Sequence, residues 1–403
     1  MFSKILIANR GEIAVRIIRA CKEMGVATVA VYSEADKNAL HVALADQSYC
    51  IGGNEPSESY LNEDRIISAA IMAGAQAIHP GYGFLSENAH FARLCRKNGI
   101  VFIGPDPDDM ERLRDKAILK ELFSETGLSV IPGTKAVTSV EAAKKAASQI
   151  GYPVMLKACA GGGGRGIRLI RSDDDMEEAF FQATSEASAA FGDGSVYLEK
   201  YIFPARHVEV QILADEHGNV VCLGDRDCSL QRRNQKLIEE TPSPAVNDKQ
   251  RKKIIPLATE AIKKIGYVGA GTLEFLLDTE GHFWFMEMNV RLQVEHSVTE
   301  MLTVLDIVKW QIRIAAGIPL NFTQKDIHLR GSAIECRINA QSCGTLQMLH
   351  VPGGPSVRFD TYLIEGTTVS PYYDSLIGKL IVFAGTREEA LRKIRASLCE
   401  LVI

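Results

Sequence analysis

From Met286 to Glu295, apolar and polar residues alternate at every position. In an extended strand, a period of two places alternate side chains on opposite faces. The segment therefore predicts a strand with one apolar and one polar face. The polar face would carry two acids, two amides and one arginine: Glu287, Asn289, Arg291, Gln293 and Glu295. A solvated strand usually shows Lys, Thr and Ser instead, so this composition indicates a binding site.

The run Gly271–Asp278 predicts the antiparallel partner of this strand. A two-residue turn at 280–281 would place Glu274 directly opposite Glu287, about 5 Å away. Two carboxylates at that distance repel each other unless a cation neutralises them. With Asn289 beside them, they predict a Mg²⁺ or Mn²⁺ site that also binds phosphates. The alternative is a turn of opposite parity, which would separate the acids and leave a solvated face.

A glycine-rich segment, Ala158–Gly166, lies between the predicted strands Val154–Lys157 and Ile167–Ile170. Consecutive glycines let backbone N–H groups approach phosphate oxygens. The pattern GxxxxGK[ST] of a P-loop is absent. Because Lys157 and the upstream Lys116 could neutralise phosphate charge, the segment predicts a phosphate-binding flap. The alternative is a flexible hairpin without a ligand.

Two further segments are rich in polar groups. The run His207–Ile212 also alternates, with His207, Glu209 and Gln211 on one face. The segment Asp225–Lys236 is dense in cations and amides and predicts a loop that could cradle an anion. As an isolated charge run, it would equally fit a solvated loop.

The first hundred residues alternate short apolar runs with helical periodicity, which predicts a parallel α/β sheet. The first turn has one glycine in place of GxGxxG, which argues against a dinucleotide site. The loop His79–Asn88 follows a strand, where open sheets present ligand-facing residues. The predicted strands are Lys4–Ala8, Thr28–Tyr32, Ala77–Ile78 and Val101–Gly104, and the helices are Ile13–Met24 and Asp64–Ala73.

Later segments predict a smaller helix and strand region followed by long antiparallel strands. The predicted strands are His207–Ala214, Val220–Gly224, Gly271–Asp278 and Phe283–His296. The predicted helices are one capped by Ser139 and ending at Ile150, one over Val298–Ala316, and a last one that Thr386 and Glu389 begin.

Composition excludes several classes of protein. The net charge of −5 argues against a nucleic-acid partner. No run of eighteen apolar residues occurs, and the apolar stretch Ile5–Ala8 is too short for a signal peptide, so we expect neither a membrane span nor secretion. The 9 cysteines include no CxxC pair. They predict reduced thiols in a cytoplasmic protein and no zinc site.

Taken together, the motifs resemble biotin carboxylase, the ATP-grasp subunit of bacterial acetyl-CoA carboxylase. Related domains occur in pyruvate, propionyl-CoA and methylcrotonyl-CoA carboxylases. The likeness covers nearly the whole chain and rests on Ile7–Ala14, His79–Asn88, Ala160–Arg168, Tyr197–Tyr201, Glu287–Glu295, Glu335–Asn339 and Pro371–Ser375.

The resemblance implies an α/β and α+β fold class: an ATP-grasp fold, preceded by a parallel α/β N-terminal domain and followed by a mixed C-terminal domain. The expected bounds are 1–113, 114–325 and 326–403, with a glycine-lid subdomain at about 131–202.

It also implies the site residues. ATP would contact Lys116, Lys157, Gly163, Gly164, Glu199, Lys200, Tyr201, Ile202, His207, Gln231, Asn234, Glu274 and Glu287. Two Mg²⁺ or Mn²⁺ ions would bind Glu274, Glu287 and Asn289. Bicarbonate and biotin would contact Lys236, Arg291, Gln293, Val294, Arg337 and Tyr82.

In the implied reaction, the catalytic residues are Arg291, Glu295 and Lys236. Glu295 acts as general base on bicarbonate, which attacks the γ-phosphate of ATP to give carboxyphosphate and ADP. Carboxyphosphate releases CO₂ and phosphate, the phosphate takes the N1 proton of biotin, and Arg291 stabilises the enolate. The implied partners are a biotin carboxyl carrier protein, carboxyltransferase subunits and a second copy in a homodimer, with malonyl-CoA for fatty acid synthesis as the eventual product.

The chain departs from the family at four places. Asn234 stands where a histidine is usual near the nucleotide, which predicts weaker ATP binding. Val290 replaces a usual threonine. About nine residues are missing near Gln341–Gly344, on the biotin side. The chain also ends at Ile403, before the usual last helices, which suggests a shortened form or a fragment.

Two other interpretations stay open. A carbamoyl-phosphate synthase-like ATP-grasp ligase would share the metal strand, although Tyr82, Arg337 and Pro371–Ser375 favour biotin. A non-catalytic nucleotide-binding homologue would be expected to lose part of the polar face, which is complete here.

Overall fold

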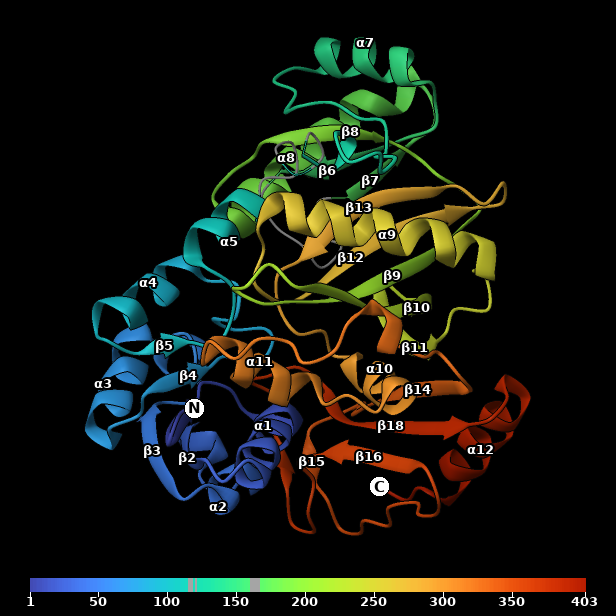
Figure 1. Ribbon diagram of the computed structural model, residues 1–403. Coiled ribbons are helices and arrows are strands. Elements are labelled where there is room, and N and C mark those ends of the chain that lie inside the picture. The colour runs from blue at the N-terminus through green and yellow to red at the C-terminus, as the bar shows by residue number, and fades with distance from the viewer. Residues whose placement is uncertain (115–118, 120–121, 160–166) are drawn as a thin grey trace.

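The computed structural model describes all residues of the chain except 115–118, 120–121 and 160–166. A parallel sheet lies at one end of the molecule, a large sheet runs through its middle, and a small sheet stands at the opposite end (Figure 1). The predicted fold class is confirmed. No helix among the described residues has the length and apolar character needed to cross a bilayer.

The N-terminal part contains a five-stranded parallel sheet in the order β3-β2-β1-β4-β5. Its strands are β1 (Lys4–Ile7), β2 (Ala27–Ser33), β3 (Gln47–Gly52), β4 (Ala77–His79) and β5 (Val101–Phe102). The helices around it are α1 (Gly11–Glu23), α2 (Leu40–Leu44), α3 (Glu63–Ala73), α4 (Ala89–Lys97) and α5 (Pro107–Arg114), with 3₁₀ turns at Glu34–Asp36 and Pro56–Glu58.

The middle and C-terminal parts share one eight-stranded sheet in the order β13-β12-β9-β10-β11-β14-β18-β16. Its strands are β9 (Ala205–Ala214), β10 (Val220–Arg232), β11 (Gln235–Thr241), β12 (Gly269–Asp278), β13 (Phe283–Asn289), β14 (Ser332–Asn339), β16 (Val357–Thr361) and β18 (Leu376–Ala384). We expected a separate domain to begin at residue 326. Because β11 pairs with β14, strands from both sides of that residue belong to one sheet.

A small three-stranded sheet, β7-β6-β8, packs under two helices at the top of Figure 1. It consists of β6 (Val154–Ala158), β7 (Ile167–Ile170), β8 (Val196–Lys200), α7 (Val140–Ile150) and α8 (Met176–Phe191), with a 3₁₀ turn at Asp173–Asp175. As predicted, Ser139 caps α7 by accepting from the N–H of Ala142 at 3.2 Å. The glycine-rich flap between β6 and β7 lies largely outside the described residues.

The remaining elements surround the large sheet. They are α9 (Asp248–Ile265), α10 (His296–Thr303), α11 (Ile307–Ala315), α12 (Arg387–Glu400), the 3₁₀ turn Gln324–Asp326 and the short strands β15 (Gly344–Thr345) and β17 (Thr368–Val369). The predicted helix over Val298–Ala316 is wrong, because Val304 adopts the left-handed conformation and divides it into α10 and α11. Asp306 then caps α11 by accepting from the N–H of Lys309 at 2.8 Å.

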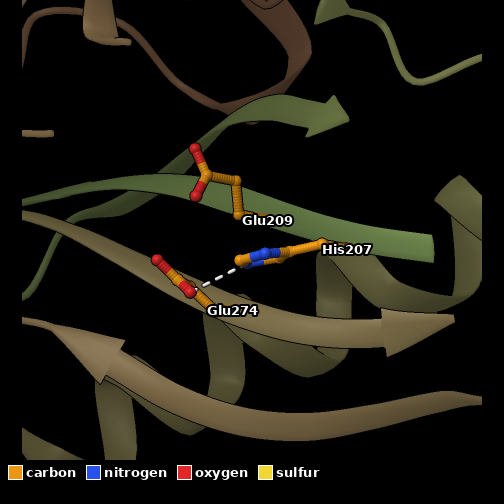
Figure 2. Close-up of side chains that lie close together, drawn as sticks. All are labelled: His207, Glu209 and Glu274. Atoms are coloured by element: carbon orange, nitrogen blue, oxygen red, sulfur yellow. Dashed lines mark hydrogen bonds and ion pairs between the residues drawn. The ribbon is translucent and has the colours of Figure 1, made fainter. Parts of the chain in front are cut away.

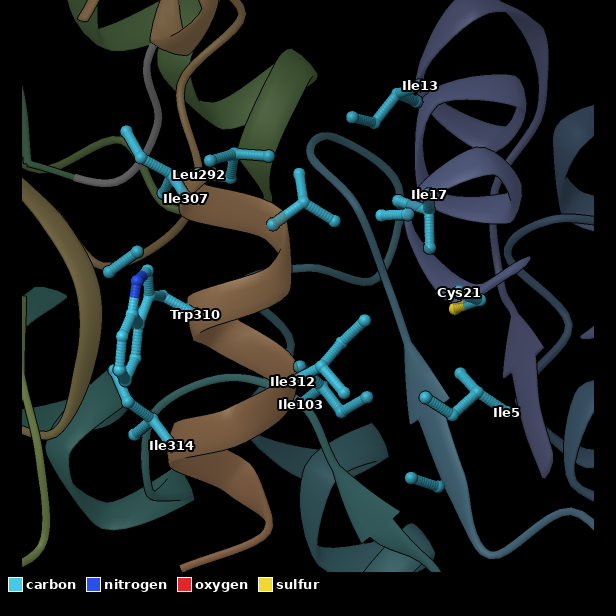
Figure 3. Packing of buried hydrophobic residues seen from close by; sticks show 14 of the residues in the cluster. Ile5, Ile13, Ile17, Cys21, Ile103, Leu292, Ile307, Trp310, Ile312 and Ile314 are labelled. Atoms are coloured by element: carbon cyan, nitrogen blue, oxygen red, sulfur yellow. The ribbon is translucent and has the colours of Figure 1, made fainter. Parts of the chain in front are cut away.

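One hydrophobic core joins the N-terminal sheet to the segment that carries the polar residues. Figure 3 shows Ile13 and Ile17 of α1 facing side chains of α11. Leu292 belongs to the same cluster, whereas Val290 packs into a second cluster beneath the large sheet. Since β13 ends at Asn289, the predicted strand up to residue 296 is wrong, and these two buried side chains hold the chain beyond it.

The loop between β12 and β13 is longer than predicted. The backbone N–H of Asp278 donates to the carbonyl of His282 at 3.1 Å, and Leu277 pairs with Phe283. Three residues, 279–281, therefore form the loop, and the predicted two-residue turn is wrong. A loop of this parity would by itself shift every later pair by one residue.

A β-bulge in β13 restores the predicted pairing. Phe275 pairs with Phe285, but the next residue back, Glu274, pairs with Glu287, so Met286 is the extra residue. A bulge lets two residues oppose one and changes the direction of the following side chain. Phe285 can thus point into the core while Glu287 faces Glu274, although a regular strand would place both on one face.

The prediction that Asp225–Lys236 forms a loop is also wrong, whereas anion binding by this segment stays a prediction. These residues belong to β10 and β11, which form a hairpin with a two-residue turn at Arg233 and Asn234. Both turn residues have positive φ, 52° and 62°. Two successive residues of this kind define a type I′ turn, which suits the twist of a β-hairpin.

Phe285 is fully buried, and its ring lies 4.3 Å from that of Phe123. We expect Phe285→Ala to lower the free energy of unfolding by about 3–5 kcal/mol, because it leaves a cavity. Urea unfolding followed by fluorescence would measure the change. The matched control is Phe181→Ala, at a side chain that is 61% exposed. Equal unfolding midpoints for the two variants would contradict the packing described for β13.

Candidate functional site

A row of charged side chains crosses four neighbouring strands of the large sheet. Glu209 of β9 lies between Arg226 of β10 and Glu274 of β12, and Glu287 of β13 follows Glu274. Cross-strand neighbours share a face at about 5 Å. Because Glu209 and Glu274 are buried, the row concentrates negative charge where water is scarce.

Glu274 accepts hydrogen bonds from several side chains. Its donors are Asn289 Nδ2 at 2.7 Å, His207 Nε2 at 2.8 Å, Gln293 Nε2 at 3.0 Å and Lys236 Nζ at 3.2 Å. Burial alone would raise the pKa of Glu274, but Lys236 and His207 hold it well below its usual range. The carboxylate is therefore charged at neutral pH.

His207 lies beside the two buried acids, and Figure 2 shows its ring directed at Glu274. Ligand atoms of His207, Glu209 and Glu274 all lie within 4.8 Å of one another. On the other side, the amide of Gln231 lies 2.9 Å from Nδ1 of His207. Burial lowers the pKa of His207, but the hydrogen bond and charge of Glu274 outweigh it and raise the pKa.

Lys236 joins three carboxylates. Its Nζ lies 2.7 Å from Glu209, 2.7 Å from Glu295 and 3.2 Å from Glu274. Burial would lower the pKa of Lys236, but these three charges raise it well above its ordinary value. Lys236 is thus a permanent cation at the centre of the site.

Glu295 is fully buried and contacts two cations. Lys236 binds Oε1 at 2.7 Å, and Arg337 Nη2 binds Oε2 at 2.9 Å. Burial would raise the pKa of Glu295, but Lys236, Arg337 and Arg226 hold it well below its usual range. The structure therefore brings together the predicted base, a predicted bicarbonate ligand and the predicted biotin contact.

Arg291 lies at the edge of this cluster and is only partly buried. Its guanidinium donates to Gln293 at 3.0 Å and to Asn289 at 3.1 Å. Its Nε lies 2.9 Å from Glu87, in the His79–Asn88 loop. The loop that we predicted to face a ligand thus orients an arginine of the polar segment.

The carbonyl of Val294 accepts a hydrogen bond from Lys379 Nζ at 2.7 Å. Lys379 is fully buried and also pairs with Glu12, to which the Tyr82 hydroxyl donates. Burial raises the pKa of Glu12 to about 7, although Lys379 opposes the rise. The structure therefore links Tyr82 to Val294 through buried groups of α1 and β18.

Another group of the predicted ATP residues lies on the small sheet or directly after it. Lys157 pairs with the buried Glu199 across β6 and β8. Lys200 donates to the backbone carbonyl of residue 151 at 2.7 Å. The ring of Tyr201 stacks on that of Phe203, and Ile202 lies between them in the chain, partly buried.

Other predicted ATP contacts fall elsewhere. Asn234 is exposed at the tip of the β10–β11 hairpin, two residues from Lys236. Lys116, Gly163 and Gly164 lie outside the described residues.

The residues proposed for Mg²⁺ or Mn²⁺ fit such an ion by chemistry and register. Glu274 and Glu287 are direct partners across β12 and β13, and Asn289 reaches Glu274. Carboxylate and amide oxygens are the ligands that hard divalent cations prefer. A second group of possible ligands comprises Glu209, Cys228 and Glu295, but Lys236 already bridges its two acids.

Sequence reasoning missed several residues of the site. Glu209 was noticed only as part of an alternating run, and Arg226 only within a charge run. Glu87 was one polar residue of a loop. Their roles depend on which strands become neighbours, and a strand order of β9 between β10 and β12 cannot be read from local periodicity.

Three family models match the chain in order. They are described as "Biotin carboxylase, N-terminal domain" over 1–110, "Carbamoyl-phosphate synthase L chain, ATP binding domain" over 115–323, and "Biotin carboxylase C-terminal domain" over 335–403. The first and last models distinguish this chain from a carbamoyl-phosphate synthase, although the middle one is shared in name.

Curated relatives align over nearly all of the chain. A biotin carboxylase of Nostoc sp. is 53% identical over 100% of this chain and 92% of its own length. Biotin carboxylase 1 of Bacillus subtilis is 49% identical over 100% and 92%. The 2-oxoglutarate carboxylase small subunit of Hydrogenobacter thermophilus is 52% identical over 99% and 86%.

Solved structures agree with these matches. A biotin carboxylase of Campylobacter jejuni in complex with β,γ-ATP superposes with a TM-score of 0.98 at 50% identity, covering 100% of this chain and 92% of that one. The biotin carboxylase domain dimer of the Hydrogenobacter thermophilus 2-oxoglutarate carboxylase, with MgADP, ADP and bicarbonate, gives 0.97 at 51% identity, covering 100% and 91%. Since relatives about 50% identical over the whole chain and two of the three family models are of biotin carboxylases, the chain belongs to the biotin carboxylase family of ATP-grasp ligases.

Proposed function

We propose that this chain uses ATP and bicarbonate to carboxylate biotin on a biotin carboxyl carrier protein. One observation carries the proposal: Glu295 is buried and ionised between Lys236 and Arg337, next to the paired acids Glu274 and Glu287. This arrangement sets a base and an anion pocket beside a site for metal and phosphate. Such a juxtaposition suits bicarbonate attack on a γ-phosphate.

In this proposal Lys236, Arg291, Gln293 and the backbone of Val294 bind bicarbonate, and Glu295 removes its proton. Charge-assisted hydrogen bonds from Lys236 and Arg291 suit a small oxyanion. The guanidinium of Arg291 then stabilises the biotin enolate after carboxyphosphate has decomposed. A single preorganised donor to an oxyanion contributes about 2.7–4 kcal/mol to catalysis.

The nucleotide would lie between the small sheet and the row of acids. Lys157, Lys116 and the backbone at Gly163 and Gly164 would face its phosphates, with His207 and Gln231 near the large sheet. Glu199, Lys200, Tyr201 and Ile202 would contact the remainder of the nucleotide, and Asn234 would approach it from the hairpin tip. When bound by Glu274, Glu287 and Asn289, Mg²⁺ or Mn²⁺ supplies positive charge to offset the transferring phosphoryl group.

Arg337 is the proposed biotin contact, and it also binds the proposed base, Glu295. It occupies one oxygen of Glu295 and also binds Glu239 at 2.6 Å. If biotin draws the guanidinium away, Glu295 keeps Lys236 as its direct cation partner. The pKa of Glu295 then rises, because one stabilising charge is lost. Biotin binding on the Tyr82 side would thus make the base stronger.

We further propose that the chain serves acetyl-CoA carboxylase and works as a homodimer with separate carboxyltransferase subunits. The support is the group of relatives named simply biotin carboxylase, and the homologous domain described as a dimer. Relatives at similar identity belong to 2-oxoglutarate and pyruvate carboxylases, and these name the competing acceptors.

Glu295→Gln should lower bicarbonate-dependent ATP cleavage by about 10²–10⁴-fold, because an amide cannot accept the proton of bicarbonate. ATP binding, measured by calorimetry, should change little. Initial rates of ADP formation with and without free biotin provide the assay. Glu216→Gln, at an exposed acid outside the site, is the control. Unchanged turnover in the Glu295 variant would disprove its role as base.

Asn234→His should lower the KM for ATP by about fivefold or more, since stacking of an aromatic ring on a base contributes ~1 kcal/mol or more. Histidine tolerates the positive φ of this turn position better than most residues do. Asn234→Gly keeps the turn but adds no ring, and should not lower the KM. Equal values for both variants would show that this position does not contact the nucleotide.

The acceptor can be tested by reconstitution. The chain, a biotinylated carrier protein and the carboxyltransferase for acetyl-CoA, pyruvate or 2-oxoglutarate would be mixed with labelled bicarbonate. We expect label in malonyl-CoA. Label transferred only to a 2-oxo acid would overturn the assignment to acetyl-CoA carboxylase while leaving biotin carboxylation intact.

A further inference from the structure

Two buried glutamates face each other next to Arg337, the arginine that also binds Glu295. Glu239 of β11 and Glu335 of β14 are direct partners in the ladder, and both are fully buried. Direct partners lie about 5 Å apart on one face. This pair is separate from the acids of the metal site, which lie on β12 and β13.

One oxygen of each carboxylate accepts a hydrogen bond. Glu239 Oε1 accepts from Arg337 Nε at 2.6 Å, and Glu335 Oε2 accepts from the Ser297 hydroxyl at 2.6 Å. Among the residues that the structure describes, Glu239 Oε2 and Glu335 Oε1 have no hydrogen-bond partner. A buried oxygen without a partner is costly, and one proton between the two carboxyls would satisfy both oxygens.

Both positive and negative groups surround the pair. The groups that face it are Arg337 of β14, Lys379 of β18, Ser297 of α10, Cys228 of β10, Glu12 of α1 and Glu295 just before α10. Burial raises the pKa of Glu239 to about 8, with Glu335 and Glu295 adding to the rise and Arg337 opposing it. Burial also raises the pKa of Glu335, against the effect of Lys379.

We propose that Glu239 and Glu335 share one proton at neutral pH, and that this singly charged pair positions Arg337 on Glu295. Arg337 has one nitrogen on Glu239 and another on Glu295. If both members of the pair were ionised, they would compete with Glu295 for the same guanidinium. With one proton, the pair holds Nε of Arg337 and leaves Nη2 for the base. The positioning role rests on the function proposed above, whereas the shared proton does not.

Loss of the shared proton should therefore weaken activity as the pH rises past about 8. In Glu335→Gln, the amide can donate to Glu239 Oε2 at every pH, and the repulsion between the acids is gone. Glu239 then stays ionised over the whole range. We expect the alkaline limb of kcat/KM for bicarbonate-dependent ATP cleavage, normalised to its own maximum, to move up by at least about one pH unit.

Glu280→Gln, at an exposed acid of the β12–β13 loop, is the matched control and should keep the wild-type profile. An alkaline limb that is the same in wild type and Glu335→Gln would overturn the positioning role.

The proton itself can be detected without turnover. Infrared difference spectra at neutral pH, wild type minus Glu335→Gln, should show the carbonyl band of a protonated carboxylic acid. Glu239→Gln should remove the same band, and this second variant keeps the test available if the first one does not fold. A band that persists in both variants, or is absent from wild type, would overturn the shared proton even if the enzyme is active. If the wild-type protein shows the band but has no bicarbonate-dependent ATP cleavage, the proposed function is contradicted and the shared proton is not.

Discussion

The site depends on one buried ammonium group. Lys236 contacts Glu209, Glu274 and Glu295, which come from β9, β12 and the segment before α10. Burial alone would raise the pKa of Glu274 and of Glu295, and Lys236 is the largest of the charges that lower it again. Removing one member of a buried ion pair costs about 3–5 kcal/mol, since its partner remains charged. The low pKa values of Glu274 and Glu295 therefore depend on the strand order that brings Lys236 next to them.

The alternating segment Met286–Glu295 shows how much of the site could be predicted from sequence. Alternation indicated the facing pair Glu274 and Glu287, and the structure contains it. The reasoning behind it was incomplete, because a three-residue loop and a β-bulge compensate for each other. Neither has a sequence signature as strong as the alternation itself. Local pattern therefore predicted the facing of the two acids correctly and the backbone path only in part.

Longer-range features were harder to predict. The parallel N-terminal sheet and the antiparallel runs follow from periodicity and were largely correct. The pairing of β11 with β14, which places Glu239 opposite Glu335 and brings Arg337 to Glu295, joins segments about a hundred residues apart. Periodicity within either strand carries no information on that choice. The family resemblance supplied Arg337, but it did not supply the acids that orient it.

The continuous eight-stranded ladder has a consequence for how such chains can change length during evolution. Inserting one residue within β10 or β11 would turn Lys236 to the opposite face of the sheet, away from its three acids. The segment 341–344 lies beyond the end of β14, next to a cavity of about 340 Å³. Losing or gaining residues there leaves the eight-stranded sheet in register, because only the short strand β15 begins in this segment. Insertions and deletions should therefore accumulate in the connections of this fold and be purged from its strands.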